Sequence, residues 1–266
     1  MFLSEPGKTG YDLNFSLLGF PCRVHPAFFV LPLLFGQGLV ASGRNLSGSE
    51  LNTGVGLIVI AGLFFISILI HELGHAIAFR RFGIHSRIVL YWMGGLAIPD
   101  SGGAWSRPRS GSLTPNQQII VSLAGPIFGL LIAVVFIVLV LAVGGRLEMH
   151  YGGYIPLPLP DLRGTFLEGN AVVMTLVFSG IAVNIFLNLL NLVPIYPLDG
   201  GQVARQVMLK FDAHNGIRNS LIVSIACAVL IAVVAFSKSE QFLGIFFGFM
   251  AYSNFQALQQ FGGPRW

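Results

Sequence analysis

Apolar runs long enough to cross a lipid bilayer are the feature that most restricts how this chain can fold. A helix needs about 20 such residues to span the hydrocarbon layer. Of the 266 residues, 54% are hydrophobic and only 10% are charged, against about 25% charged in an ordinary soluble domain. We therefore predict an all-α polytopic membrane protein, one membrane-embedded domain over residues 1–266, with about six spans near 27–42, 54–79, 117–143, 171–196, 217–236 and 241–258.

Basic residues are divided unevenly between the segments that separate these runs. One alternate set holds eleven: Lys8, Arg23, Arg80, Arg81, Arg87, Arg107, Arg109, Arg205, Lys210, Arg218 and Arg265. The other set holds four: Arg44, Arg146, Arg163 and Lys238. Because cytoplasmic loops carry the excess of Lys and Arg, an even number of spans places both termini in the cytoplasm. The basic residues form no stripe, so no nucleic acid partner is expected.

The second apolar run leads directly into His71, Glu72 and, after two more residues, His75. Ionisable side chains inside a membrane helix are costly unless they bind something, so their position indicates chemistry. His71 and His75 are four residues apart and share one helix face, where both imidazoles can bind one metal ion. Glu72 lies about 100° round the helix, where it can act on water without being a ligand itself.

A catalytic zinc site needs a third protein ligand and a position left open for water. The fourth expected span ends where prolines at positions 194 and 197 break the helix and glycines at 200 and 201 let the chain turn. Asp199 would thus be delivered on irregular backbone, at the same cytoplasmic depth as the two histidines. We predict that His71, His75 and Asp199 bind one Zn2+ per chain.

Three asparagines, Asn184, Asn188 and Asn191, share one face of the fourth expected span, at i, i+4 and i+7. For Asn184 and Asn188 we expect hydrogen bonds to neighbouring helices, which are worth about 0.6 kcal/mol per contact in membranes. Asn191 is nearest to the helix break and the expected metal. It is therefore the one that we expect to touch substrate.

The segment from Ile84 to Arg109 contains an apolar, strand-like stretch, Ile88 to Met93, that is far too short to span. Glycine pairs and a proline punctuate the residues after this stretch. We expect a β-hairpin or re-entrant loop, which at membrane depth is tolerated only against protein or a watery cavity. An ordinary interfacial loop is the alternative.

Three motifs together give the chain a resemblance to a known family. H-E-L-G-H lies in one expected span, Ala124-Gly125-Pro126 in the next, and N-x-x-P-x-x-P-L-D-G, starting at Asn191, ends the one after. In this order they resemble the site-2 protease family of intramembrane zinc metalloproteases, and in particular its compact prokaryotic members without a PDZ or CBS domain.

The resemblance implies the ligands named above, with Glu72 as the general base, and it adds roles for further residues. Asn191 would help to hold or polarise the scissile peptide. Gly94 and Gly95 match the glycine pair of the family's re-entrant element and would contribute to substrate binding. His25 resembles a residue with which compact members open their first span, and it stays outside the expected ligand set.

The expected activity is hydrolysis of a peptide bond in or near a transmembrane segment of a membrane protein, as in regulated intramembrane proteolysis. The strand from Ile88 to Met93 could pair with unwound substrate backbone by β-augmentation. The partners would be a transmembrane substrate and the bilayer of a prokaryotic inner (cell) membrane, with the site towards the cytoplasm. A regulatory membrane partner or a homo-oligomer stays open.

Two other functions stay open from the sequence. A membrane metal transporter could use two histidines and an aspartate as a transit site, although no second polar cluster continues the path outward. A catalytically inactive relative could bind membrane helices without cutting them, although the intact Glu72 argues against it.

Overall fold

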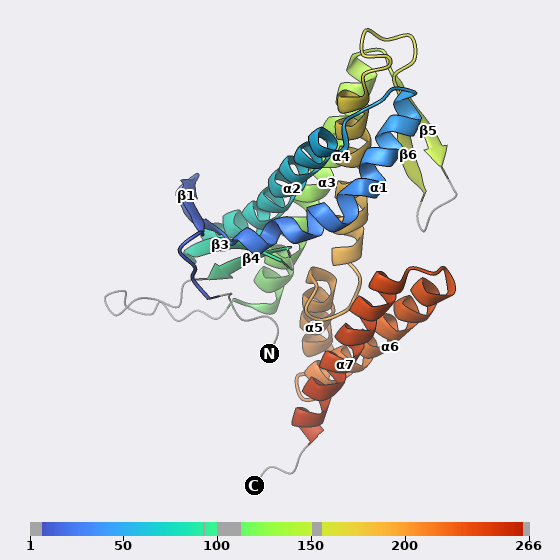
Figure 1. The fold of residues 1–266 in the computed structure, drawn as a ribbon. Helices are drawn as coiled ribbons and strands as arrows, with labels where there is room; N and C mark the ends of the chain where they lie inside the picture. Colours follow the sequence, from blue (N-terminus) through green and yellow to red (C-terminus); the bar gives the residue numbers. More distant parts are fainter. Residues whose placement is uncertain (1–6, 93, 100–112, 151–155, 263–266) are drawn as a thin grey trace. The chain divides into compact units, whose positions relative to one another are not determined.

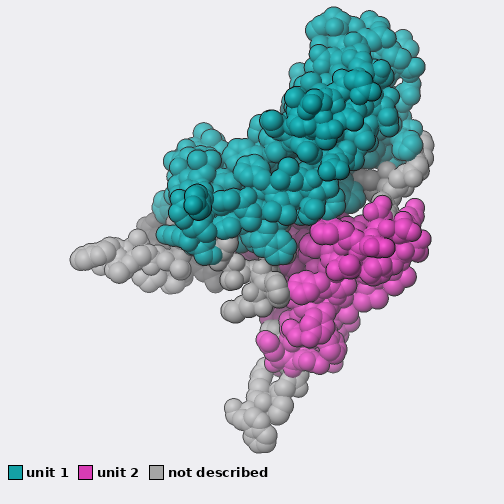
Figure 2. All heavy atoms as spheres, viewed as in Figure 1, with its two compact units in different colours: residues 1–107, 127–188 teal, residues 108–126, 189–266 magenta. Residues whose placement is uncertain are grey.

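The computed structural model describes residues 7–92, 94–99, 113–150 and 156–262, and it is mostly helical (Figure 1). The chain divides into two compact units, residues 1–107 with 127–188 and residues 108–126 with 189–266 (Figure 2). Within the described residues, five helices are long and apolar enough to cross a membrane: Pro26–Ser47, Thr53–Arg81, Pro115–Ala142, Ala171–Asn191 and Gly216–Ser237. The protein is therefore an integral membrane protein, as the composition predicts.

The first unit holds helices α1 (Val30–Ser47) and α2 (Thr53–Arg81), with most of α3 (Pro115–Ala142) and α4 (Ala171–Asn191). A short 3-10 helix, η1 (Pro26–Phe29), leads into α1. The loop between α3 and α4 carries a two-stranded sheet, β5 (Arg146–His150) and β6 (Leu157–Asp161). Helix α2 contains the histidine motif, so this unit carries that part of the site.

A four-stranded sheet packs against α2 and fixes the surroundings of the histidines. Its order is β1 (Leu13–Leu17), β2 (Phe20–Val24), β3 (Ser86–Tyr91) and β4 (Gly94–Pro99). Strand β2 runs parallel to β3, while the other two pairs are antiparallel. The core between sheet and helix contains apolar side chains of β2, β3 and α2, namely Phe20, Cys22, Val24, Leu69, Leu73, Ala76, Ile88 and Leu90.

The hairpin prediction is confirmed by β3 and β4, with Met93 and residues 100–109 of the expected segment lying outside the described residues. The pairing of the hairpin with β1 and β2 was not foreseen. The expected pairing of the Ile88 to Met93 strand with substrate is wrong for the described part of that strand. Strand β3 already pairs with β2 on one side and β4 on the other, so it has no open edge.

The second unit contains α5 (Asp199–Phe211), α6 (Gly216–Ser237) and α7 (Gln241–Gly262). Helix α5 was not expected. The fourth span ends at Asn191 rather than near 196, because Pro194 cannot continue it. The sixth expected span does form a helix, α7, but it is not among the five described helices that are long and apolar enough to cross a membrane. Its second half carries several polar residues: Ser253, Asn254, Gln256, Gln259 and Gln260.

Candidate metal centre

His71, Glu72 and His75 lie on a buried turn of α2, where each keeps less than a tenth of its surface exposed. One potential ligand atom from each lies within 4.8 Å of the others. The Nε2 atoms of the two histidines are 3.2 Å apart. A tetrahedral zinc ion with bonds of about 2.0–2.1 Å needs two ligand nitrogens roughly 3.3–3.4 Å apart. The imidazole pair therefore fits zinc with almost no adjustment.

The ring of His71 is oriented by a residue of α4. Its Nδ1 atom lies 2.7 Å from Oδ1 of Asn188, inside the buried core. The expectation of hydrogen bonds between helices is confirmed for Asn184, which donates to Ser67 of α2, and for Asn188. The partner of Asn188 is an expected metal ligand, His71, and this contact is not predictable from the spacing of the asparagines alone. One feature of the sequence does point to this contact: Asn188 lies on the same helix face as Asn191, the asparagine expected near the metal.

Glu72 is enclosed by the first residues of β4. A Cβ atom on Gly95 would lie 2.3 Å from Cγ of Glu72 and 2.6 Å from its Oε1, so only glycine allows this approach. Gly94 has φ +117°, a conformation that side chains rarely adopt. Burial raises the pKa of the Tyr91 phenol on β3, and the Glu72 carboxylate adds to the rise. The glycine pair thus lets the hairpin turn and close over the expected general base.

In the second unit, Asp199 is the first residue of α5, and Asn191 is the last residue of α4. The connecting residues 192–198 are held both by the buried side chain of Ile195 and by hydrogen bonds of their backbone. Ser224 accepts a hydrogen bond from the N–H of Tyr196, and Asn254 donates one to its carbonyl. The Tyr196–Pro197 peptide bond is cis. Since Asp199 and Asn191 belong to a different unit from the histidines, their part in the site stays a prediction.

Gly200 and Gly201 complete this break, because the start of α5 packs directly on the connecting backbone. A Cβ on Gly200 would lie 2.1 Å from the carbonyl oxygen of Leu192, and one on Gly201 would lie 2.3 Å from the carbonyl carbon of Ile195. The sequence argument expected these glycines to provide a turn. In the structure, the two glycines instead allow the start of α5 to lie close against the connecting backbone.

His25 has a structural task at the start of η1. Its Nδ1 accepts a hydrogen bond from the backbone N–H of Ala27, which makes it the N-cap of the short helix. Its own backbone N–H donates to the carbonyl of Leu90 and extends the pairing of β2 with β3. The Nδ1 atom of this side chain is thus used as a helix cap.

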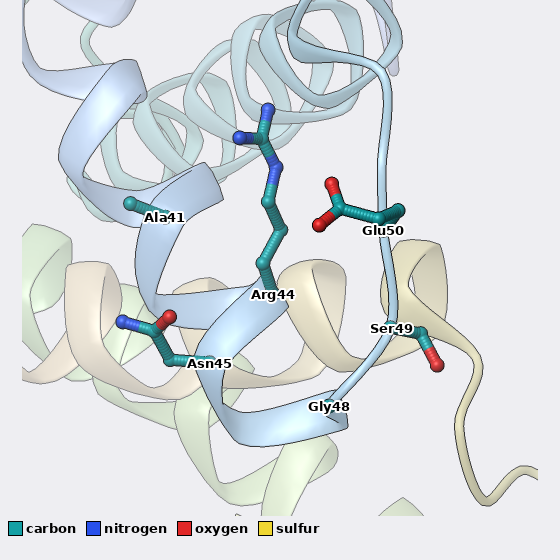
Figure 3. Close-up of a pocket in the computed structure, with 6 residues that line it drawn as sticks. All are labelled: Ala41, Arg44, Asn45, Gly48, Ser49 and Glu50. Carbon is teal, nitrogen blue, oxygen red and sulfur yellow. The ribbon is translucent and has the colours of Figure 1, made fainter.

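An open cavity of about 470 Å³ lies at the turn between α1 and α2, lined by Ala41, Arg44, Asn45, Gly48, Ser49 and Glu50 (Figure 3). In Figure 3 the side chains of Arg44 and Glu50 extend from opposite sides of it. None of the expected site residues lines this cavity. The candidate centre is instead defined by the buried cluster on α2.

Comparisons with known proteins bear directly on this cluster. The sequence model of peptidase family M50 matches residues 59–237, which include most of α2, all of α3 and α4, and the break before α5. The chain belongs to peptidase family M50. This confirms the resemblance to the site-2 protease family.

Two relatives are similar along most of this chain. A Synechocystis protein, sll0528, is 32% identical over 75% of this chain and 45% of its own length, and the Methanocaldococcus jannaschii protein MJ0392 is 25% identical over 74% and 45%. Both carry "zinc metalloprotease" in their names. The chain thus spans about half the length of these two relatives.

The fold also has a solved counterpart. The site-2 protease from Methanocaldococcus jannaschii matches with a TM-score of 0.50 and 20% identity, covering 93% of this chain and 95% of that one. At this identity the likeness concerns the fold alone. It agrees with the five apolar helices described above.

Proposed function

We propose that this M50 protein is a zinc-dependent intramembrane endopeptidase. The observation that carries the proposal is the pair of buried Nε2 atoms, 3.2 Å apart, with the Glu72 carboxylate beside them. His71, His75 and Asp199 would hold the ion. Bound zinc supplies a Lewis acid that polarises the scissile carbonyl and lowers the pKa of water towards about 7.

Glu72 is proposed as the general base. It takes the proton of the attacking water and passes it to the leaving amine, which is the usual task of a carboxylate placed beside two metal-binding histidines. Gly95 leaves no space beside the Cγ of this side chain, so the carboxylate is confined on one side. Asn191 is proposed to hold the scissile peptide.

The substrate would bind along β4, which together with β1 forms the edges of the described four-stranded sheet. Leu90 accepts a hydrogen bond from His25, so its polar backbone groups face β2. In an antiparallel pair, the backbone N–H and C=O groups of its partner Gly95 then face away from β3. The backbone groups of Ala97, two residues later, face the same way. An unwound substrate segment could pair with these groups immediately beside Glu72.

Strand addition can be tested with one backbone hydrogen bond. Ala97→Pro removes the N–H that points to the open edge, whereas Ala97→Val keeps it. We expect Ala97→Pro to abolish cleavage and retain zinc, with Ala97→Val close to the parent protein. Equal cleavage by both variants would rule out strand addition at this position.

The orientation proposed for the site follows from the end of α2. Arg80 and Arg81 close this helix about one turn beyond His75, and cytoplasmic ends carry such residues. We therefore propose a site towards the cytoplasmic face of a prokaryotic inner membrane, with both termini in the cytoplasm. A reporter enzyme that works only in the cytoplasm should be active when it is fused after Arg81. A reporter that works only outside the cytoplasm should be inactive at the same position.

The experiment that tests the function uses the purified full chain in liposomes with a single-span membrane protein as substrate. Zinc-loaded protein should cleave it, a chelator should stop cleavage, and added zinc should restore it. Zinc uptake into the vesicles without cleavage would instead indicate a transporter. Zinc binding and substrate capture without cleavage or uptake would indicate an inactive relative.

A further inference from the structure

We propose that Asn188 is a positioning residue that fixes the tautomer of His71 and thereby sets the affinity of the centre for zinc. The inference rests on the proposed function, since it concerns the same metal. Neither the family motifs nor the sequence analysis assigns this role to Asn188. It follows from contacts between α2, α3 and α4 within the first unit.

The first step is the orientation of the Asn188 amide. Its Nδ2 donates to the backbone carbonyl of Asn184 at 2.6 Å, so its Oδ1 is the atom that faces His71. A carbonyl oxygen can only accept a hydrogen bond. The Nδ1 atom of His71, 2.7 Å away, must therefore carry the proton.

The second step concerns the other ring nitrogen. A neutral imidazole with a proton on Nδ1 has its lone pair on Nε2. That atom faces the Nε2 of His75 at 3.2 Å, which is where a shared metal ion would lie. Asn188 thus selects the form of His71 that can bind metal, and it holds the ring plane at the same time.

The third step is what keeps the amide in place. Asn184 donates to Ser67 of α2 and to the carbonyl of Gly180, which ties this part of α4 to the histidine helix. On α3, Gly129 leaves the space that the amide fills. A Cβ there would lie 2.2 Å from both Nδ2 and Oδ1 of Asn188, so even alanine would displace the side chain.

A simpler view is that Asn188 only joins two helices, a contact worth about 0.6 kcal/mol in membranes. That view predicts a small loss of stability and no specific effect on metal binding. The positioning role predicts a change in zinc affinity that depends on a hydrogen-bond acceptor at position 188. The two views therefore differ in what they predict for variants that keep the fold.

The test is the zinc dissociation constant of the purified full chain, measured by competition with a chromophoric chelator. Asn188→Leu removes the acceptor, and we expect zinc binding to weaken about 10–100-fold, the usual effect of losing an outer partner of a metal-binding histidine. Asn188→Asp keeps an acceptor oxygen and should bind close to the parent affinity. The Co2+-substituted proteins should show the same order in the intensity of their d–d absorption.

Gly129 supplies an independent variant in case Asn188→Leu fails to fold. Gly129→Ala should weaken zinc binding as Asn188→Leu does, and the double variant should be no weaker than either single one. Gly62→Ala on α2, where a Cβ meets nothing within 4 Å, is the control and should bind zinc normally.

The inference is overturned if Asn188→Leu and Gly129→Ala bind zinc within about twofold of the parent, a change far below the 10–100-fold expected. It is also overturned if Asn188→Asp is as weak as Asn188→Leu. A parent protein without stoichiometric zinc is a different outcome. It would overturn the proposed function itself, and this inference with it.

Discussion

The two compact units present their candidate site residues in contrasting ways. In the first, His71, Glu72 and His75 lie on an uninterrupted helix, and neighbouring side chains and one strand hold their side chains in place. In the second, Asp199 follows a break in the chain that is held by contacts of its backbone with Gly200, Ser224 and Asn254. Substitutions around the histidines should therefore alter chemistry while the fold survives, and substitutions of the residues that hold the break should alter stability.

The largest expected effect tests whether both units contribute to one centre. His71→Ala removes a proposed zinc ligand outright, so zinc binding should weaken by more than about 100-fold, the upper range for the loss of an outer partner. Asp199→Ala should match it. His25→Ala, which removes only a helix cap, should keep zinc. Measured by chelator competition, normal zinc affinity in Asp199→Ala would exclude the second unit from the metal site.

The next effect separates catalysis from metal binding within the first unit. Gly95→Ala forces the Glu72 side chain or β4 to move, and misplacement of a reacting group by about 1 Å can cost 10²-fold in rate. Cleavage should fall by about that factor at unchanged zinc content. Gly38→Ala, whose Cβ meets nothing within 4 Å, is the control. Unchanged cleavage by Gly95→Ala would show that the close contact has no catalytic role.

In the second unit, the matching glycine change should act on stability. Gly200→Ala puts a Cβ into the backbone of residue 192, and overpacking of this kind costs about 1–3 kcal/mol. Thermal unfolding in detergent should show the loss, with Gly248→Ala of α7 as the control in open space. An equally stable Gly200→Ala protein would contradict the close packing of this break.

The smallest effect concerns one hydrogen bond of the break. Ser224→Ala leaves the N–H of Tyr196 without its acceptor, which should cost about 1 kcal/mol. Ser220→Ala in the same helix removes a hydroxyl that donates only within α6, so it should cost less. If the unfolding curves place the two variants in the opposite order, the backbone of the break is not held as described.

The contrast between the units also explains what could be predicted from the sequence. His71, Glu72 and His75 follow from helical spacing, and the hairpin follows from a short apolar run before Gly94 and Gly95, because both patterns are local. The contact between His71 and Asn188 joins residues 117 positions apart, and β2 pairs with a strand more than 60 residues later. Nothing local in the sequence specifies either pairing.

The break before Asp199 shows the same limit from the other side. Two prolines predict that the helix must end, and they do so correctly. They do not predict that α5 begins at Asp199 itself, because that start depends on how Gly200 and Gly201 pack against residues 192–196. The sequence thus shows where the chain becomes irregular, but not which backbone conformation it adopts there.

The most direct test of the account measures zinc content and peptide cleavage on one preparation of the Glu72→Gln protein, beside the parent. The account predicts about one zinc per chain in both, cleavage by the parent, and none by Glu72→Gln. A Glu72→Gln protein that still cleaves substrate, or a parent that cleaves without zinc, would contradict it.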